Sequence, residues 1–119
     1  MSRDIRLYLD DILSSIQSVQ KYTAHLNQKD FLADRKTFEA VAFNLQIIGE
    51  AAKQIPERYR QEYPQINWKK VVGLRNIIVH TYFSLSETVI WDISQNKLGD
   101  LSDCISQMQE QIDREISGE

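Results

Sequence analysis

The sequence predicts an all-α fold, an up-and-down bundle of four to five helices that occupies residues 1–119 as a single domain. Three observations predict this class. Apolar residues recur every three or four positions in most segments. No segment alternates between apolar and polar residues as a half-buried strand does. Four Gly and two Pro in 119 residues are too few for a loop-rich β-sandwich.

The first half of the chain predicts two long amphipathic helices. The first is expected over residues 3–24, with Ser2 as its N-cap, and residues 27–30 are expected to form a connection. The second begins at Phe31 or Asp34 and ends at Ile55, because Pro56 follows. The apolar positions that define the two helices are Ile5, Leu9, Ile12, Ile16 and Val19, and then Phe38, Val41, Leu45, Ile48, Ala52 and Ile55.

The middle of the chain predicts a short helical segment over residues 57–63 and a longer helix over residues 68–80, capped by Asn67. The longer segment is apolar nearly all the way round. Such a run is also compatible with a buried strand, but the helical period of its neighbours favours a helix. A helix that is apolar on every side is buried on every side. We therefore expect a second chain to cover part of it.

The last segment begins near Ser84, where Ser84 and Glu87 have the spacing of a capping box. Apolar residues then continue at helical spacing to Ile116. Residues 96–99 end in a glycine, which weakens a helix by about 1 kcal/mol relative to alanine. The pattern is consistent with two helices or with one long bent helix.

Composition excludes several classes of protein. The single cysteine, Cys104, rules out a disulfide framework within the chain and a site built from several cysteines. No apolar run approaches the roughly 20 residues of a membrane span, and the first residues lack the pattern of a secretory signal. We therefore expect a cytoplasmic protein without a membrane partner.

Charge is distributed unevenly. The net charge of −3 argues against nucleic-acid binding driven by overall charge. Residues 53–80, however, hold six basic and two acidic residues, a net charge of +4, so the rest of the chain carries −7. Such a segment can hold a phosphate, although from charge alone an ordinary solvated surface is the favoured explanation.

Most catalytic motifs are absent. The sequence contains no Glu-x-x-His pair of a di-iron bundle, no H-E-x-x-H, no G-x-S-x-G, no phosphate-binding glycine loop and no EF-hand loop. Two histidines and one cysteine do not favour a zinc site within one chain. We expect no metal and no cofactor.

The polar residues Arg75, Asn76 and His80 stand out within the most apolar helix, and Tyr82 follows them. A buried arginine needs a carboxylate, a helix C-terminus or a bound anion to compensate its charge. Glu50 is a candidate partner, although a surface charge is the simpler interpretation. Asn76 and His80 lie one turn apart, whereas Arg75 and His80 lie about 140° apart on a regular helix. Without further information, a capping or core role is the simpler explanation of these residues, and catalysis is the alternative.

These residues resemble the R-x-x-x-x-H-x-Y signature of the HepT-like toxins in the HEPN superfamily. The segment Gly49-Glu50-Ala51-Ala52-Lys53, followed by Ile55-Pro56, is similar to a second segment of that family, and Trp68 and Trp91 fit its pattern. The resemblance extends from the first helix to about Ile112.

The resemblance implies a helical homodimer in which the motifs of two chains form a metal-independent endoribonuclease site on RNA, with no DNA substrate expected. Arg75 and His80 would be catalytic, with Asn76 and Tyr82 in support. It also implies the toxin of a type II toxin–antitoxin system, whose partner is a minimal nucleotidyltransferase that can transfer AMP to Tyr82. The alternative is a non-catalytic helical dimer that binds this partner or a nucleotide. A third interpretation is a helical scaffold whose polar cluster only caps a helix end.

Other residues have simpler structural interpretations. Gly49 is expected at a close helix crossing, His25 at the surface and Cys104 in the interior. Trp68 and Trp91 are expected to anchor the core or an interface. Lys69 and Lys70 could guide RNA to the site, although a solvated helix face is the simpler explanation.

Overall fold

The computed structural model of the chain describes residues 3–81, 84 and 86–118, and these form helices and no strand. The predicted all-α class is therefore confirmed. The helices are α1 (Ile5–Thr23), α2 (Gln28–Leu32), α3 (Arg35–Lys53), α4 (Glu57–Arg60), α5 (Trp68–Thr81), α6 (Glu87–Asn96) and α7 (Leu98–Ser117).

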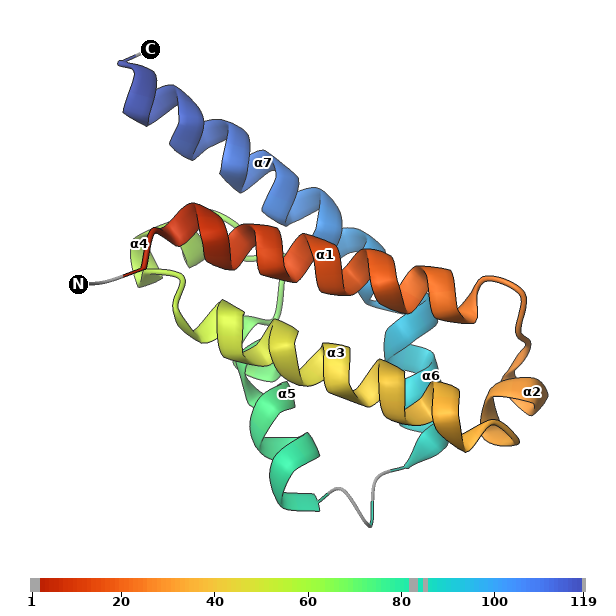
Figure 1. Cartoon of the computed structure of the whole chain (residues 1–119). Coiled ribbons are helices and arrows are strands. Elements are labelled where there is room, and N and C mark those ends of the chain that lie inside the picture. Colours follow the sequence, from red (N-terminus) through yellow and green to blue (C-terminus); the bar gives the residue numbers. More distant parts are fainter. Residues whose placement is uncertain (1–2, 82–83, 85, 119) are drawn as a thin grey trace.

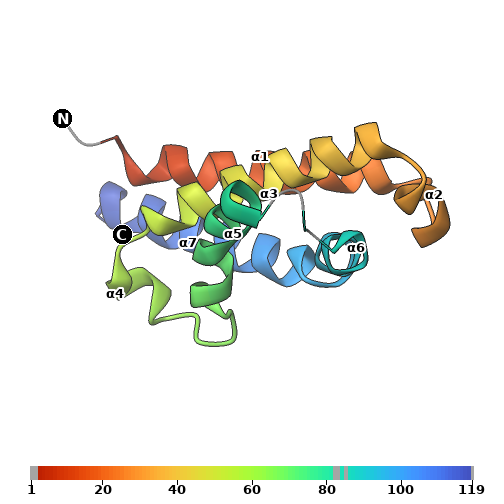
Figure 2. The same ribbon diagram turned by 90° about the horizontal axis from the view of Figure 1, so that it is seen from below.

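The core lies between α1, α3 and α7. Helices α1 and α3 run antiparallel side by side, α7 packs against α1, and α5 crosses α3 on another side (Figures 1 and 2). Both predicted apolar stripes point inward, which confirms the helical period of the first two segments. Fully buried side chains of the three central helices include Leu9, Ile12, Ile16, Val19, Val41, Leu45, Ile48, Ile105 and Met108.

Two helix starts differ from the sequence prediction in the first half of the chain. The N-cap of α1 is Asp4, whose carboxylate accepts a 2.9 Å hydrogen bond from the backbone N–H of Arg6. The predicted cap, Ser2, lies outside the described residues. The expected connection at residues 27–30 is wrong, because Asn27 caps the short helix α2, which buries Phe31. A helix of five residues is too short to show a period in the sequence.

The second half resolves the alternatives for the last segment. Two helices are present, separated at Lys97, rather than one bent helix. Helix α6 is capped by Ser86, whose hydroxyl accepts from the backbone N–H of Val89 at 3.3 Å. The predicted capping box of Ser84 and Glu87 is therefore wrong, because Glu87 is the first residue of the helix. Ile116 is 60% exposed, since α7 diverges from α1 toward its C-terminal end (Figure 1).

The structural interpretations of Cys104, His25, Trp68 and Trp91 are confirmed. Cys104 is buried, and this burial raises the pKa of its thiol to about 11. His25 is exposed. The indole N–H of Trp68 donates to the carbonyl oxygen of Tyr63 at 3.1 Å. The ring centroids of Trp91 and Phe31 lie 5.1 Å apart. Within the part of the chain that the structure describes, no helix is both long and apolar enough to cross a membrane.

Candidate active site

The site is built where α3 and α5 cross, and Gly49 makes the crossing close. A Cβ atom at Gly49 would lie 2.6 Å from the backbone nitrogen of Arg75 and 3.2 Å from the carbonyl oxygen of Val71. Only glycine leaves room for the two backbones at this distance. The predicted close crossing is thus confirmed, and it brings Glu50, the next residue of α3, beside Arg75.

Arg75 is held by two neighbours. Its Nε lies 2.6 Å from Oε1 of Glu50, and its Nη1 donates to Oδ1 of Asn76 at 3.2 Å. The Nε atom is shielded from solvent, but its N–H is not aligned for a hydrogen bond, so the contact with Glu50 is an ion pair. Among the three possible compensations for the charge of Arg75, the structure contains the carboxylate.

The expectation that Arg75 is buried is wrong. The side chains of Arg75 and Glu50 are 40% and 49% exposed. The reason is geometric: Arg75 lies at the margin of the helix crossing, where Leu74 and Ile78 take the buried positions of α5. The guanidinium is therefore oriented by the protein while part of it stays accessible to an anionic ligand.

His80 lies in the last turn of α5, one turn beyond Asn76, and both side chains are exposed. Helix α5 continues through Thr81, so the separation of about 140° between Arg75 and His80 is retained. Among the described residues no contact joins these two side chains within one chain. Tyr82 lies outside the described residues.

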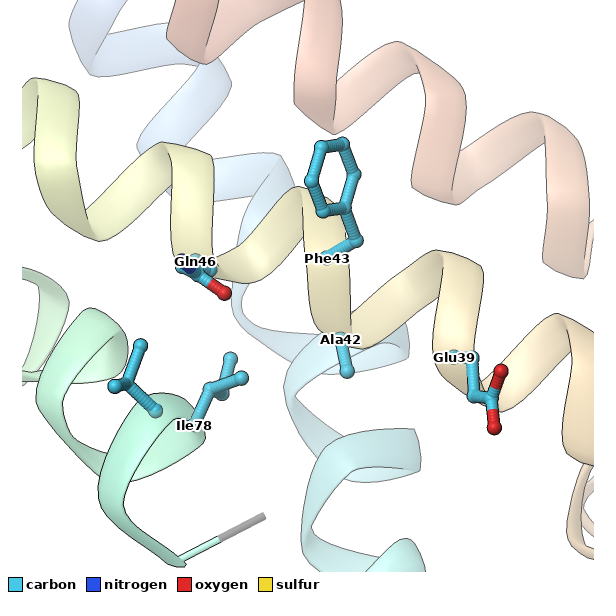
Figure 3. A pocket seen from close by; sticks show the side chains of 6 residues that line it. Glu39, Ala42, Phe43, Gln46 and Ile78 are labelled. Atoms are coloured by element: carbon cyan, nitrogen blue, oxygen red, sulfur yellow. The ribbon is translucent and has the colours of Figure 1, made fainter.

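Apolar side chains are exposed beside the site. A hollow of about 280 Å³ between α3 and α5 is lined by Ala42, Gln46, Ile78 and neighbouring residues (Figure 3). Phe43 on its rim is 62% exposed, and Ile77 and Val79 are also exposed. The described residues therefore cover only one side of α5. We refer to the exposed side chains of Phe43 and Val79, together with the hollow that they line, as the apolar patch.

No metal-binding group is apparent in residues 3–81, 84 and 86–118, where no three His, Cys, Asp or Glu side chains are gathered closely enough to hold an ion.

The sequence-based prediction gave too little weight to Glu50 as the partner of Arg75. Its position directly after a mid-helix glycine is the signal that could have assigned it to a helix crossing.

Comparison with known proteins identifies the family. The sequence profile described as "Ribonuclease HepT-like" matches residues 12–108. The chain is 37% identical to "Putative RNase MJ0127" of Methanocaldococcus jannaschii, with 98% of this chain and 93% of that protein covered. It is also 37% identical to "Probable ribonuclease HepT" of Thermococcus cleftensis, over 76% of this chain and 83% of that protein. No solved structure matches the chain significantly.

The profile match covers most of the chain, and the Methanocaldococcus relative aligns with nearly all of it. The matched region contains α3 and α5 and thus Glu50, Arg75, Asn76 and His80. The chain therefore belongs to the HepT-like ribonuclease family of the HEPN superfamily.

Proposed function

We propose that the protein is a metal-independent endoribonuclease and the toxin of a type II toxin–antitoxin pair, with an active site composed of two copies of the chain. One observation carries this proposal. Arg75 is oriented and half-exposed beside Asn76, and an exposed histidine follows one turn later on the same helix, in a family of ribonucleases. Arginine can bind the reacting phosphate, and histidine can transfer the protons that cleavage of RNA without a metal involves.

The reaction uses the RNA's own 2′-hydroxyl as nucleophile. The 2′-oxygen attacks the adjacent phosphorus, the bond to the 5′-oxygen breaks, and a 2′,3′-cyclic phosphate and a 5′-hydroxyl result. A base must take the 2′-proton and an acid must protonate the leaving 5′-oxygen. Histidine can do either near neutral pH, and each transfer typically contributes about 10²- to 10⁴-fold in rate. DNA lacks the nucleophile and is not a substrate.

Arg75 would bind the reacting phosphate. Its planar guanidinium matches the geometry of two phosphate oxygens. Glu50 contacts Nε, so the terminal nitrogens are the ones left for the phosphate. Asn76 holds Nη1 and can donate its own amide N–H to the same anion.

A second copy is needed for a complete site. One His80 cannot act as base and as acid in the same step, whereas two copies related by a two-fold axis supply both. The separation of Arg75 from His80 within one chain and the exposed apolar patch beside them support this arrangement.

Neutralisation by a nucleotidyltransferase antitoxin completes the proposal. The phenol oxygen of Tyr82 would attack the α-phosphate of ATP, releasing pyrophosphate and leaving AMP on the tyrosine. Tyr82 follows His80 by two residues, so the added nucleotide would bring a bulky anion to Arg75 and block the site.

Cleavage of RNA by the purified chain in excess chelator tests the proposal, beside Arg75→Ala and His80→Ala shown to be folded. We expect the unaltered chain alone to cleave and to leave 2′,3′-cyclic phosphate ends. Absence of cleavage by protein whose mass shows an unmodified Tyr82 would contradict the nuclease proposal. It would instead favour a non-catalytic dimer that binds the nucleotidyltransferase or a nucleotide.

A further inference from the structure

Two glycines, Gly49 and Gly73, lie inside the helices that form the site, and their surroundings are opposite. At Gly49 an added Cβ would collide with the backbone of α5, so packing within the chain requires a glycine there. At Gly73 an added Cβ would meet no described atom within 4 Å. Glycine is a poorer helix former than alanine. Packing within the described part of the chain therefore gives no reason for Gly73, and the reason must be sought outside it.

Gly73 shares one side of α5 with three polar residues. At 100° per residue, Lys69, Gly73, Asn76 and His80 fall within a sector of about 60°. The side chains of Lys69, Asn76 and His80 are all exposed. Lys69 lies about 16 Å along the helix from His80. These four residues form what we call the α5 face, which starts at a lysine and ends at the proposed catalytic histidine.

The charge of α5 selects an anionic ligand. The helix carries Lys69, Lys70 and Arg75 and no Asp or Glu. Within the described residues, neither lysine ammonium forms an ion pair. Two copies packed directly through this face would bring like charges together, which is unfavourable. A polyanion lying along the face would neutralise them.

We propose that the α5 face is the track on which the RNA backbone lies, an inference that rests on the proposed ribonuclease function. Lys69 binds a phosphate other than the one that reacts, because it lies about 16 Å from His80. Gly73 removes a side chain between them, so that the strand approaches the helix backbone closely. Lys69 and Gly73 are thus RNA-binding positions rather than solvated surface.

Binding of a 2′-O-methyl RNA oligonucleotide, which cannot be cleaved, tests the role of Lys69. For Lys69→Gln we expect a Kd several-fold higher and a plot of log Kd against log salt that is shallower by about 0.7, the value for one phosphate contact on a single strand. Lys29→Gln removes the same charge from an exposed lysine of α2 and should match the unaltered chain. An unchanged Kd and salt slope for Lys69→Gln would overturn the proposal.

Gly73→Ala gives a second test with an unusual signature. Because the space is open and alanine favours a helix, we expect a melting temperature a few degrees higher. We expect weaker binding of the same RNA, because the methyl group stands in the path of the strand. A purely structural role would change stability and binding in the same direction. Dissociation of the copies with unchanged RNA affinity would overturn the proposal and assign Gly73 to a contact between chains.

Failure of this proposal is distinguishable from failure of the proposed function. If the unaltered chain cleaves RNA and both variants bind RNA as tightly as it does, the proposed role of the α5 face is wrong and the proposed ribonuclease function is retained. If the unaltered chain binds RNA with the expected dependence on Lys69 and Gly73 but cleaves no RNA, the proposed RNA-binding role of the α5 face is retained and the proposed ribonuclease function is wrong. A chain that neither cleaves nor binds contradicts both.

Discussion

At the scale of single residues, the contact between Arg75 and Glu50 matters for position more than for stability. Both side chains are partly exposed, and exposed ion pairs contribute about 0–1 kcal/mol to folding. The same contact fixes one edge of the guanidinium and leaves its other nitrogens available. A phosphate arriving at Arg75 would therefore meet a side chain that is already oriented.

Glu50→Ala should lower RNA cleavage by about tenfold, because an unanchored guanidinium loses part of its pre-organisation. The melting temperature should change by no more than about 2 °C, since the pair is exposed. Glu50→Gln keeps an acceptor oxygen, so its cleavage rate should lie between those of the unaltered chain and of Glu50→Ala. Initial cleavage rates and thermal melts measure both effects.

Glu57→Ala is the matched control, because the side chain of Glu57 is 70% exposed and also forms an ion pair with an arginine, Arg60, at 3.3 Å. It should cleave RNA like the unaltered chain. Equal cleavage by Glu50→Ala and Glu57→Ala would show that the Glu50 contact has no positioning role.

The burial of Cys104 predicts that the folded protein loses stability at alkaline pH. Burial raises the pKa of its thiol from 9.0 to about 11. The folded state therefore disfavours the thiolate, and the stability that Cys104 contributes is complete below pH 9 and falls as pH rises toward 11. The slope for one proton is about 1.4 kcal/mol per pH unit. Denaturant unfolding of the unaltered chain and of Cys104→Ala at several pH values should show their difference shrinking over this range. A constant difference would contradict the prediction.

At the scale of elements, the crossing of α3 and α5 determines where the site lies. Helix α5 can approach α3 only because Gly49 has no side chain, and this approach sets the distance between Glu50 and Arg75. The obstacle to a larger residue is the backbone of α5, which cannot rotate away as a side chain can.

Gly49→Ala should destabilise the protein by about 1–3 kcal/mol, the usual cost of overpacking, although alanine favours a helix. RNA cleavage should also fall, because α5 must shift away from Glu50. Gly99→Ala is the control, since Gly99 lies in α7 with open space around it and should be neutral or slightly stabilising. Equal unfolding free energies for the two variants would contradict the close crossing.

At the scale of the whole molecule, the exposed apolar patch on α3 and α5 predicts association of two copies. Phe43→Glu should give a folded monomer, because the side chain is 62% exposed and its replacement disturbs no core. Cleavage should be lost, because acid and base would come from different chains. Light scattering, circular dichroism and cleavage assays measure the three outcomes.

Ile116→Glu serves as the control, since Ile116 on α7 is equally exposed, at 60%, and lies away from the patch. It should remain a dimer and should stay active. A dimeric Phe43→Glu protein, or an active monomer, would contradict the proposed composite site.

The sequence predicted the long helices well and their ends poorly. An apolar stripe repeats over several turns, so the helices around Leu45 and Ile105 could be recognised locally. A cap depends on one side chain and one N–H. Asp4 and Ser86 therefore could not be distinguished from Ser2 and Ser84 by pattern alone. The short helix α2 buries a single large residue and leaves no period to detect.

The sequence by itself determined the helical class, the family resemblance and the proposed site residues Arg75, Asn76 and His80, because each depends on residues close together in the chain. Only the tertiary structure decided that Glu50 pairs with Arg75, that the pair is half-exposed, and that Gly49 and Gly73 have opposite surroundings. The physical reason is that the crossing joins residues some 25 positions apart, and no local pattern encodes which faces of two helices meet.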